Sequence, residues 1–378
     1  MRIGIVGKGK MGLDIFSYFL DRGCELVLVV RREEDVQTLS SKITKQFDRM
    51  KKRGVLDEKD YEKKVNSFKI CTSYKELGGC NLVIESVIED LSVKQEIMEK
   101  IEENVNEDCI IASNSSSLDL DRVFERCHNT KRCMGLHFFF PVKYIEYVEI
   151  NKADCTESQY AMCLNKEIRN LGKKVLFLQK NENYLLSKMI TVIVSYSYLL
   201  YCEGKMSIDQ IDRLIKNELI MFGPFEMMDS TGLVIINQCT DSFLTKRYYD
   251  MIKNIGDEVK RALENGYAGG LSEKGFKLFE QEQKEAGKEF DTSESEAISD
   301  EYLKRIKAVV CNEIAYLHNE RGVDGSQCME AVEEILGFRK KIKEIYHDVK
   351  SGIHDVLKKD YQKYNIPCMQ EEAYTLYE

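Results

Sequence analysis

The chain lacks tryptophan and has very little proline. Its 378 residues contain no tryptophan and only three prolines, and two of these, Pro141 and Pro224, lie within motifs described below. No apolar run reaches the ~18 residues that a membrane-spanning helix needs. The N-terminus reads as the first strand of a fold and not as a signal peptide. We therefore expect a cytoplasmic protein that does not span a membrane.

The cysteines indicate neither disulfides nor a metal site. There are 13 of them, an odd number, and none stands in a Cys-x-x-Cys pair. Cys127 and Cys133 are six residues apart, which is a poor spacing for metal ligands. We expect reduced, mostly buried thiols in a reducing compartment, and no metal. The formal net charge of −9 argues against binding to nucleic acid.

The first recognisable motif is a glycine-rich turn near the N-terminus. A short apolar strand, Met1–Val6, leads directly into Gly7-Lys8-Gly9-Lys10-Met11-Gly12, and a helical pattern of apolar residues follows. A strand, a Gly-x-Gly-x-x-Gly turn and a helix in this order form the dinucleotide-binding fingerprint. In it the first glycine permits the tight turn, the second admits the pyrophosphate and the third allows close packing. The helix N-terminus then offers backbone N–H groups to the phosphates.

The second expected strand, Glu25–Val30, bears on which cofactor is bound. NAD-binding members of this fold place an acidic residue at its end, where it bonds the ribose hydroxyls. Here Arg31 and Arg32 stand at that point. A guanidinium there would pair with the 2′-phosphate of NADP, so we expect NADP(H) to be favoured over NAD(H). The alternative is two exposed arginines, with Glu33 reaching the ribose.

The stretch Cys109–Ile150 carries the parts of a general-base site. An apolar strand ends in the cluster Ser113-Asn114-Ser115-Ser116-Ser117, His137 stands in an apolar setting, and Glu149 lies on a further apolar strand. In such a site the histidine accepts a proton and the carboxylate stabilises the resulting imidazolium. A core histidine beside a surface glutamate is the alternative, which the N-terminal fingerprint makes less attractive.

Six motifs in order make the chain resemble a known family. They are Gly7–Gly12, Ile84–Leu91, Ala112–Ser117, His137–Phe139, Val148-Glu149 and Gly223–Glu226. Together they are similar to the L-3-hydroxyacyl-CoA dehydrogenases, including the bacterial 3-hydroxybutyryl-CoA dehydrogenases, well over residues 1–240 and loosely beyond. The resemblance implies a Rossmann-type doubly wound α/β sheet followed by all-α domains. It also implies a nicotinamide cofactor and an acyl-CoA substrate.

The resemblance further implies roles for individual residues. His137 would be the catalytic base, Glu149 its partner and Ser116 the group that bonds the substrate oxygen. The other residues expected at the cofactor are Lys10, Met11, Glu89, Lys94, Asn114 and Phe140. Ser187 would act beside the catalytic residues. Lys51 and Lys52, in a basic run on a charged helical segment, would contact the phosphates of coenzyme A; a solvated helix face is the alternative.

The chain also departs from the family pattern in three places. Phe140 replaces an asparagine after the His-Phe-Phe motif. The segment Lys180–Tyr184 replaces an Asp-Thr-Pro-Gly-Phe turn, and Ser187-Lys188 replaces an Asn-Arg pair. These changes leave hydride transfer plausible and put the substrate in question. The other hypotheses are a dehydrogenase acting on a carrier-protein thioester or another hydroxy acid in secondary metabolism, and a non-catalytic nucleotide-binding relative.

We expect four segments along the chain. Residues 1–180 form the dinucleotide-binding domain, 181–279 a helical substrate and dimerisation domain, 280–298 a linker, and 299–378 a second, diverged helical domain. Two long helices, one near residues 185–204 and one over Tyr302–Leu317, each precede an acidic turn with glycine, which suggests a repeat. An unrelated helical appendage is the alternative. The assembly would be a homodimer or a monomer that mimics one.

Overall fold

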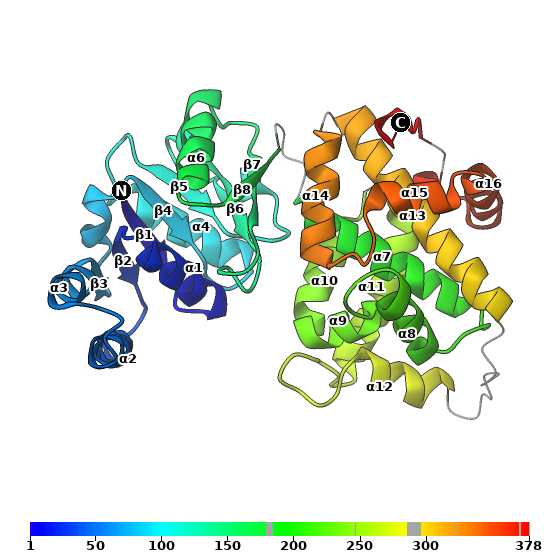
Figure 1. Ribbon diagram of the computed structural model, residues 1–378, viewed down its shortest axis with the longest axis horizontal. Coiled ribbons are helices and arrows are strands. Elements are labelled where there is room, and N and C mark those ends of the chain that lie inside the picture. Colours follow the sequence, from blue (N-terminus) through cyan, green and yellow to red (C-terminus); the bar gives the residue numbers. More distant parts are fainter. Residues whose placement is uncertain (179–183, 246, 286–295, 322, 370–371, 378) are drawn as a thin grey trace. The chain divides into compact units, whose positions relative to one another are not determined.

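A computed structural model describes residues 1–178, 184–245, 247–285, 296–321, 323–369 and 372–377. The chain divides into two compact units, Met1–Asn183 and Tyr184–Glu378, and Figure 1 shows a sheet-containing unit and an all-helical one. Residues 180–183 of the altered turn, 286–295 of the expected linker and Gly322 lie outside the described residues.

The N-terminal unit is built on a mostly parallel sheet. Over the described residues it has eight strands in the order β3-β2-β1-β4-β5-β6-β7-β8. Only the β6–β7 pairing is antiparallel among the strand pairs that the structure describes. The strands are β1 (Arg2–Val6), β2 (Glu25–Val29), β3 (Phe68–Cys71), β4 (Leu82–Glu85), β5 (Ile110–Ser113), β6 (Cys133–Phe138), β7 (Tyr147–Lys152) and β8 (Lys174–Leu178). The predicted Rossmann-type sheet is confirmed.

Helices cover both faces of this sheet, which explains why its strands are apolar almost throughout. They are α1 (Lys10–Asp21), α2 (Glu33–Lys52), α3 (Glu58–Asn66), α4 (Leu91–Glu102), α5 (Leu120–Val123) and α6 (Ser158–Asn170), with 3-10 turns at Tyr74–Gly79 and Thr130–Arg132. Ile3 and Ile5 belong to the core cluster that also contains residues of α1, whereas Gly4 between them faces Leu77 on the other side. The chain changes direction across the sheet at β1, between β2 and β4. Ligands of such sheets bind beyond the carboxyl ends of the strands at this point.

The second unit is helical and is organised around α7 (Leu185–Cys202), which is buried along nearly its whole length. The other helices are α8 (Ile208–Glu218), α9 (Pro224–Thr231), α10 (Leu233–Ser242), α11 (Tyr249–Glu264), α12 (Phe276–Glu280), α13 (Glu296–Arg321), α14 (Gly325–Leu336), α15 (Ile342–Val349) and α16 (Ile353–Tyr364). Short turns occupy Gln281–Glu285, Pro367–Met369 and Thr375–Tyr377. Ser207 caps α8 in a capping box with Gln210, as the sequence predicts.

Helix α7 bears on the expectation that the chain does not span a membrane. Among the described residues it is long and apolar enough to cross a membrane by length and composition, although no such segment was expected. Serines, a threonine and one lysine interrupt the apolar residues of α7, so the sequence shows no continuous apolar run there. Because 83% of the helix is buried inside the protein, it packs as the core helix of the unit.

The described residues at both ends of the expected linker, 280–298, are helical. Its first residues continue from α12 into a π-helical turn, Gln281–Glu285, and α13 begins at Glu296. Glu296, Asp300 and Glu301 lie in the first turns of α13, where negative charge favours the helix N-terminus. Residues 286–295 lie outside the described residues. The division of the helical unit into two copies stays a prediction.

Candidate active site

The glycine turn after β1 combines two crowded positions with one open one. Gly7 has φ +119°, and a Cβ added there would lie 2.2 Å from the carbonyl oxygen of Ser86. A Cβ at Gly12 would lie 2.2 Å from the carbonyl oxygen of Gly7. A Cβ at Gly9 would meet no described atom within 4 Å. Gly7 and Gly12 therefore serve packing, and the space above Gly9 is the cradle that a pyrophosphate would fill.

The first turn of α1 adds donors and a cation to this cradle. Gly9 is the N-cap of α1 and has no side chain to satisfy the first backbone N–H groups, which could therefore bind a phosphate. Lys10 begins the helix and its Nζ lies 3.6 Å from the centroid of the Phe140 ring. Met11 is half-buried against the core. These residues fit a nicotinamide dinucleotide.

The end of β2 presents the two arginines to solvent. Arg31 and Arg32 are both exposed, and Arg32 is the N-cap of α2. The carboxylate of Glu33 accepts a hydrogen bond from Thr72. Asp35 forms an ion pair with Lys8 at 2.6 Å. Glu33 and Asp35 therefore have partners, while Arg31 and Arg32 remain exposed at the end of β2.

His137 and Glu149 meet across the antiparallel pair β6–β7, in which they lie directly opposite each other. The Nδ1 atom of His137 lies 2.9 Å from Oε2 of Glu149. Both side chains are buried, His137 at 8% exposure and Glu149 at 0%. Because a carboxylate only accepts, Nδ1 carries the proton, and Nε2 is the nitrogen that can exchange one. The Phe139 ring lies against the imidazole, with a centroid distance of 4.4 Å.

Asn114–Ser117, which follow β5, form a loop that we call the serine loop. Glu89 holds this loop in place. Its Oε1 accepts hydrogen bonds from the backbone N–H of Ser116 at 3.0 Å and of Ser117 at 3.2 Å, and from the Ser115 and Ser117 hydroxyls. No hydrogen bond of the Ser116 hydroxyl occurs within the described part of the chain. Asn114 ties this loop to the histidine strand, because its Oδ1 accepts from the Phe138 N–H at 2.9 Å.

Lys94 is buried beneath this loop between two carboxylates. Its Nζ lies 2.7 Å from Glu85 and 3.2 Å from Glu89, and the Ser113 hydroxyl donates to Glu85 at 2.7 Å. Burial by itself would raise the pKa of Glu89, but Lys94 and the serine donors outweigh it and lower that pKa. The same carboxylates overcome the effect of burial on Lys94 and raise its pKa. Lys94 and Glu89 therefore stay charged and support the serine loop.

Two supporting residues were not identified from the sequence. Glu85 reads as the end of an apolar strand, and only its charge within that run signals a buried ion pair. Asp14, on α1, accepts from the Val142 N–H at 2.7 Å and so anchors the turn that follows the His-Phe-Phe motif. Nothing in the local pattern around Asp14 indicates this bond, since the two residues are distant in sequence.

The remaining expected site residues lie away from this group or in the other unit. Lys51 forms an ion pair with Glu58 at 2.6 Å, which joins α2 to α3, while Lys52 is exposed. Ser187 lies half-buried in the first turn of α7 in the helical unit. Among the residues that the structure describes, no cluster of three or more His, Cys, Asp or Glu side chains could hold a metal.

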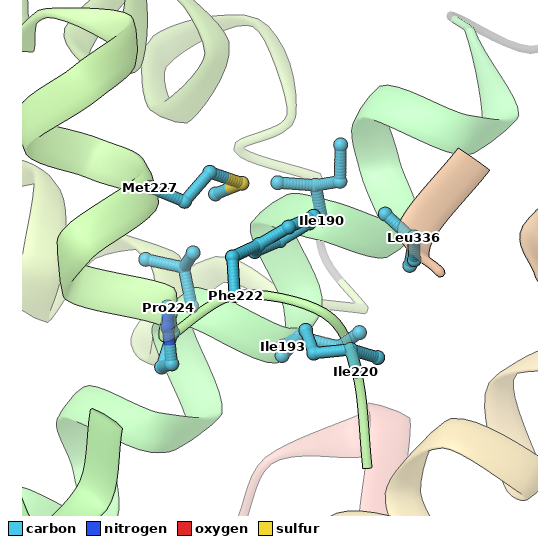
Figure 2. A pocket seen from close by; sticks show the side chains of 8 residues that line it. Ile190, Ile193, Ile220, Phe222, Pro224, Met227 and Leu336 are labelled. Atoms are coloured by element: carbon cyan, nitrogen blue, oxygen red, sulfur yellow. The ribbon is translucent and has the colours of Figure 1, made fainter. Parts of the chain in front are cut away.

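An apolar pocket lies in the helical unit, on the face of α7 that begins at Ser187. It is lined by Ile190, Ile193, Val194, Ile220, Phe222, Pro224, Met227 and Leu336. Figure 2 shows side chains from α7, from the segment before α9 and from the end of α14 gathered around it. Ser187, Ile190 and Val194 are spaced by three and four residues, so they share one helix face.

Comparison with known proteins agrees with this arrangement. Residues 2–181 match the family model of the 3-hydroxyacyl-CoA dehydrogenase NAD binding domain. A 3-hydroxybutyryl-CoA dehydrogenase of Mycobacterium tuberculosis is 25% identical over 279 residues, covering 73% of this chain and 97% of that protein. The peroxisomal fatty acid beta-oxidation multifunctional protein MFP2 of Arabidopsis thaliana is 26% identical over 294 residues, or 75% of this chain. That match takes in 39% of the plant protein, so the chain corresponds to only part of it.

A solved structure extends the likeness to the whole chain. The 3-hydroxybutyryl-CoA dehydrogenase of Escherichia coli K12 has a TM-score of 0.79 and covers 100% of this chain and 97% of its own. At 15% identity this likeness shows the fold alone. The matched domain indicates a nicotinamide cofactor, which the glycine turn fits. The chain is thus L-3-hydroxyacyl-CoA dehydrogenase-like, and its residues 2–181 match the NAD binding domain of that family.

Proposed function

We propose that the protein interconverts a short-chain 3-hydroxyacyl-CoA and the corresponding 3-oxoacyl-CoA, with His137 as general base. The observation that supports this most is the buried His137–Glu149 pair, with Nδ1 held at 2.9 Å. It lies on the same sheet that carries the glycine turn and the serine loop. Because β1, β4, β5 and β6 are parallel, their carboxyl ends meet at one edge.

Each residue of the site has its own role in the proposed reaction. The nicotinamide cofactor, when bound, accepts or supplies the hydride. In oxidation Nε2 of His137 accepts the proton of the substrate hydroxyl, and Glu149 stabilises the imidazolium; in reduction His137 returns that proton. The Ser116 hydroxyl donates a hydrogen bond to the substrate oxygen. Glu89 holds the backbone on either side of that hydroxyl and so fixes where it points.

Removal of the base tests this assignment. We expect His137→Ala to lower kcat by at least ~100-fold, since positioned general bases contribute ~10²–10⁴-fold, while cofactor binding stays nearly unchanged. Glu149→Gln should act in the same direction. The matched control is His128→Ala, because His128 is exposed and outside the site. Oxidation of NADH or NADPH with acetoacetyl-CoA measures turnover, and near-normal turnover in His137→Ala would contradict the proposal.

The acyl-CoA substrate is supported by one feature of the N-terminal unit. The exposed Lys52 suits a phosphate of coenzyme A. Phe140, where the family pattern has asparagine, favours the second candidate, a carrier-protein thioester or another hydroxy acid. A panel of free, CoA-bound and carrier-bound 3-oxo acids distinguishes the two by kcat/KM. Equal rates with free and CoA-bound acids would count against the coenzyme A contact.

We also propose that NADP(H) is preferred to NAD(H). The support is the pair of exposed arginines at the end of β2, together with Glu33 already bonded to Thr72. A charged contact contributes ~1.5–3 kcal/mol, so we expect roughly 10- to 100-fold higher kcat/KM with NADPH than with NADH. Arg31→Ala should remove most of this ratio and Arg32→Ala less, whereas Arg126→Ala, an exposed control, should not change it. A wild type that prefers NADH would refute the proposal.

The expected compartment is cytoplasmic. All 13 cysteines carry free thiols in the structure, and most of them are buried, as suits a reducing environment.

A further inference from the structure

Phe140 combines high exposure with a fixed position. The residue is 48% exposed. The backbone is nevertheless held on both sides of it. The Phe138 N–H donates to Asn114 at 2.9 Å and the Val142 N–H donates to Asp14 at 2.7 Å. The ring is therefore presented to solvent by a turn that is anchored to the serine loop and to α1.

Lys10 lies on this ring. Its Nζ is 3.6 Å from the ring centroid, within the range of a cation–π contact. Lys10 is the first residue of α1, where the positive end of the helix dipole disfavours a cation. It forms no ion pair within the described residues, whereas Lys8, two residues earlier, is paired with Asp35. A cation kept at a helix N-terminus without a carboxylate is suited to an anion that arrives from solution.

We propose that Phe140 positions the Lys10 ammonium to neutralise the pyrophosphate of the nicotinamide cofactor. The open space at Gly9, next in the chain to Lys10, is where that pyrophosphate would lie. Lys10 is then a binding residue, and Phe140 acts through it. The inference rests on the nicotinamide cofactor alone and holds for NADH and for NADPH. It gives the aromatic replacement at position 140 a task that an asparagine side chain cannot perform, because an amide has no ring face for a cation.

A double-mutant cycle tests the coupling. The variants are Phe140→Leu, Lys10→Met, their combination and Phe140→Tyr, and the dissociation constants of NADH and NADPH are measured by fluorescence titration. Tyr144→Leu is the matched control, because Tyr144 is an aromatic residue of the same segment with 76% exposure. Thermal unfolding of each variant without cofactor shows whether the fold is retained.

We expect Phe140→Leu to weaken binding of both cofactors roughly 2- to 5-fold, the size of an exposed cation–π contact. Lys10→Met should weaken it by about tenfold or more, as for a charged contact. The combined variant should be no weaker than Lys10→Met alone, and Phe140→Tyr should restore binding. The effect of Phe140→Leu should shrink at high salt. Tyr144→Leu should bind both cofactors as the wild type does.

Two results would overturn the inference. Additive losses in the double variant would show that Phe140 and Lys10 act separately, and unchanged binding in Phe140→Leu would show that the ring does nothing for the cofactor. Failure of the wild type to bind either NADH or NADPH would instead overturn the cofactor assignment itself. An additive cycle with normal wild-type binding leaves the proposed reaction intact, so the two failures are distinguishable.

Discussion

The glycines of the nucleotide turn have different tasks: Gly12 is needed for packing, whereas Gly9 leaves space for the cofactor. Substitutions can distinguish the two tasks. Gly9 has φ −60° and ψ 173°, which any residue adopts, whereas an added Cβ at Gly12 would lie 2.2 Å from a backbone oxygen. The same substitution should therefore have opposite consequences at the two positions.

We expect Gly9→Ala to leave the unfolding free energy of the cofactor-free protein unchanged or raised by ~0.4–1 kcal/mol. It should weaken cofactor binding about tenfold or more, because its methyl group occupies the space the pyrophosphate needs. Gly12→Ala should cost ~1–3 kcal/mol of stability through overpacking. Denaturant unfolding and cofactor titration measure both quantities. Strong cofactor binding by Gly9→Ala would place the pyrophosphate elsewhere.

At the scale of residues, the structure shows contacts of the predicted site residues that the sequence could not indicate. The pairing of His137 with Glu149 was predicted by resemblance, and the structure brings the two together in direct register. Glu89 and Lys94 were expected beside the nicotinamide, and the structure shows them supporting the serine loop. Their role there depends on Glu85 and Ser113, which come from other segments, and a linear pattern carries no information about such distant partners.

At the scale of elements, a buried ionic cluster joins three helices. Arg305 on α13 bonds Glu203, at the end of α7, at 2.7 Å and Asp360 on α16 at 2.9 Å. The Tyr364 hydroxyl and Lys363 also contact Glu203. Burial alone would raise the pKa of Glu203, but these partners lower it to about 2. The folded protein therefore favours ionised Glu203 more strongly than the unfolded chain does.

This difference predicts how stability depends on pH. A carboxyl whose folded pKa is depressed stabilises the fold above its ordinary pKa of 4.5, and the stabilisation is lost as pH falls toward about 2. We expect Glu203→Gln to lower the melting temperature at pH 7 and to match the wild type increasingly between those two pH values. Glu301→Gln, which removes an exposed carboxylate near Arg305, is the control. A constant difference across this range would contradict the lowered pKa.

The elements themselves were largely predictable because their apolar periodicity is strong. The sequence indicated a long helix near residues 185–204 and a strand at Lys174–Leu178, and the structure has both. It missed the helical turns at Gln281–Glu285 and the early start of α13 at Glu296. Charged stretches lack an apolar stripe, so their helicity depends on end effects that the apolar pattern does not report.

At the scale of the whole chain, the two helical segments show related contacts. Asp212 on α8 accepts from the Phe225 N–H at the start of α9 at 2.8 Å, and Glu333 on α14 accepts from the Ile342 N–H at the start of α15 at 2.7 Å. The loops that follow α8 and α14 exchange backbone bonds, from Met221 to Leu336 and from Arg339 to Leu219. We propose that residues 299–378 are a diverged repeat, which covers the surface that a partner subunit would cover.

Removal of the second segment tests this proposal. A chain ending near Glu280 loses the helices that pack against α7, and their loss should expose apolar residues. We therefore expect the shortened chain to aggregate or dimerise, whereas the full chain is a monomer or a looser oligomer than relatives with one helical copy. Light scattering after size exclusion measures this. A shortened chain that stays monomeric, soluble and active would contradict the repeat.

The single antiparallel pairing in the described sheet has a consequence for how this site can change over evolutionary time. His137 and Glu149 face each other because the register of the antiparallel pair β6–β7 makes them direct partners. Insertions in the segment between the strands leave that alignment intact. Deletion of one residue inside either strand shifts the register and turns one partner to the opposite face. Natural length variation compatible with proton transfer should therefore accumulate at residues 143–146, after the turn that Asp14 anchors, and not within the strands.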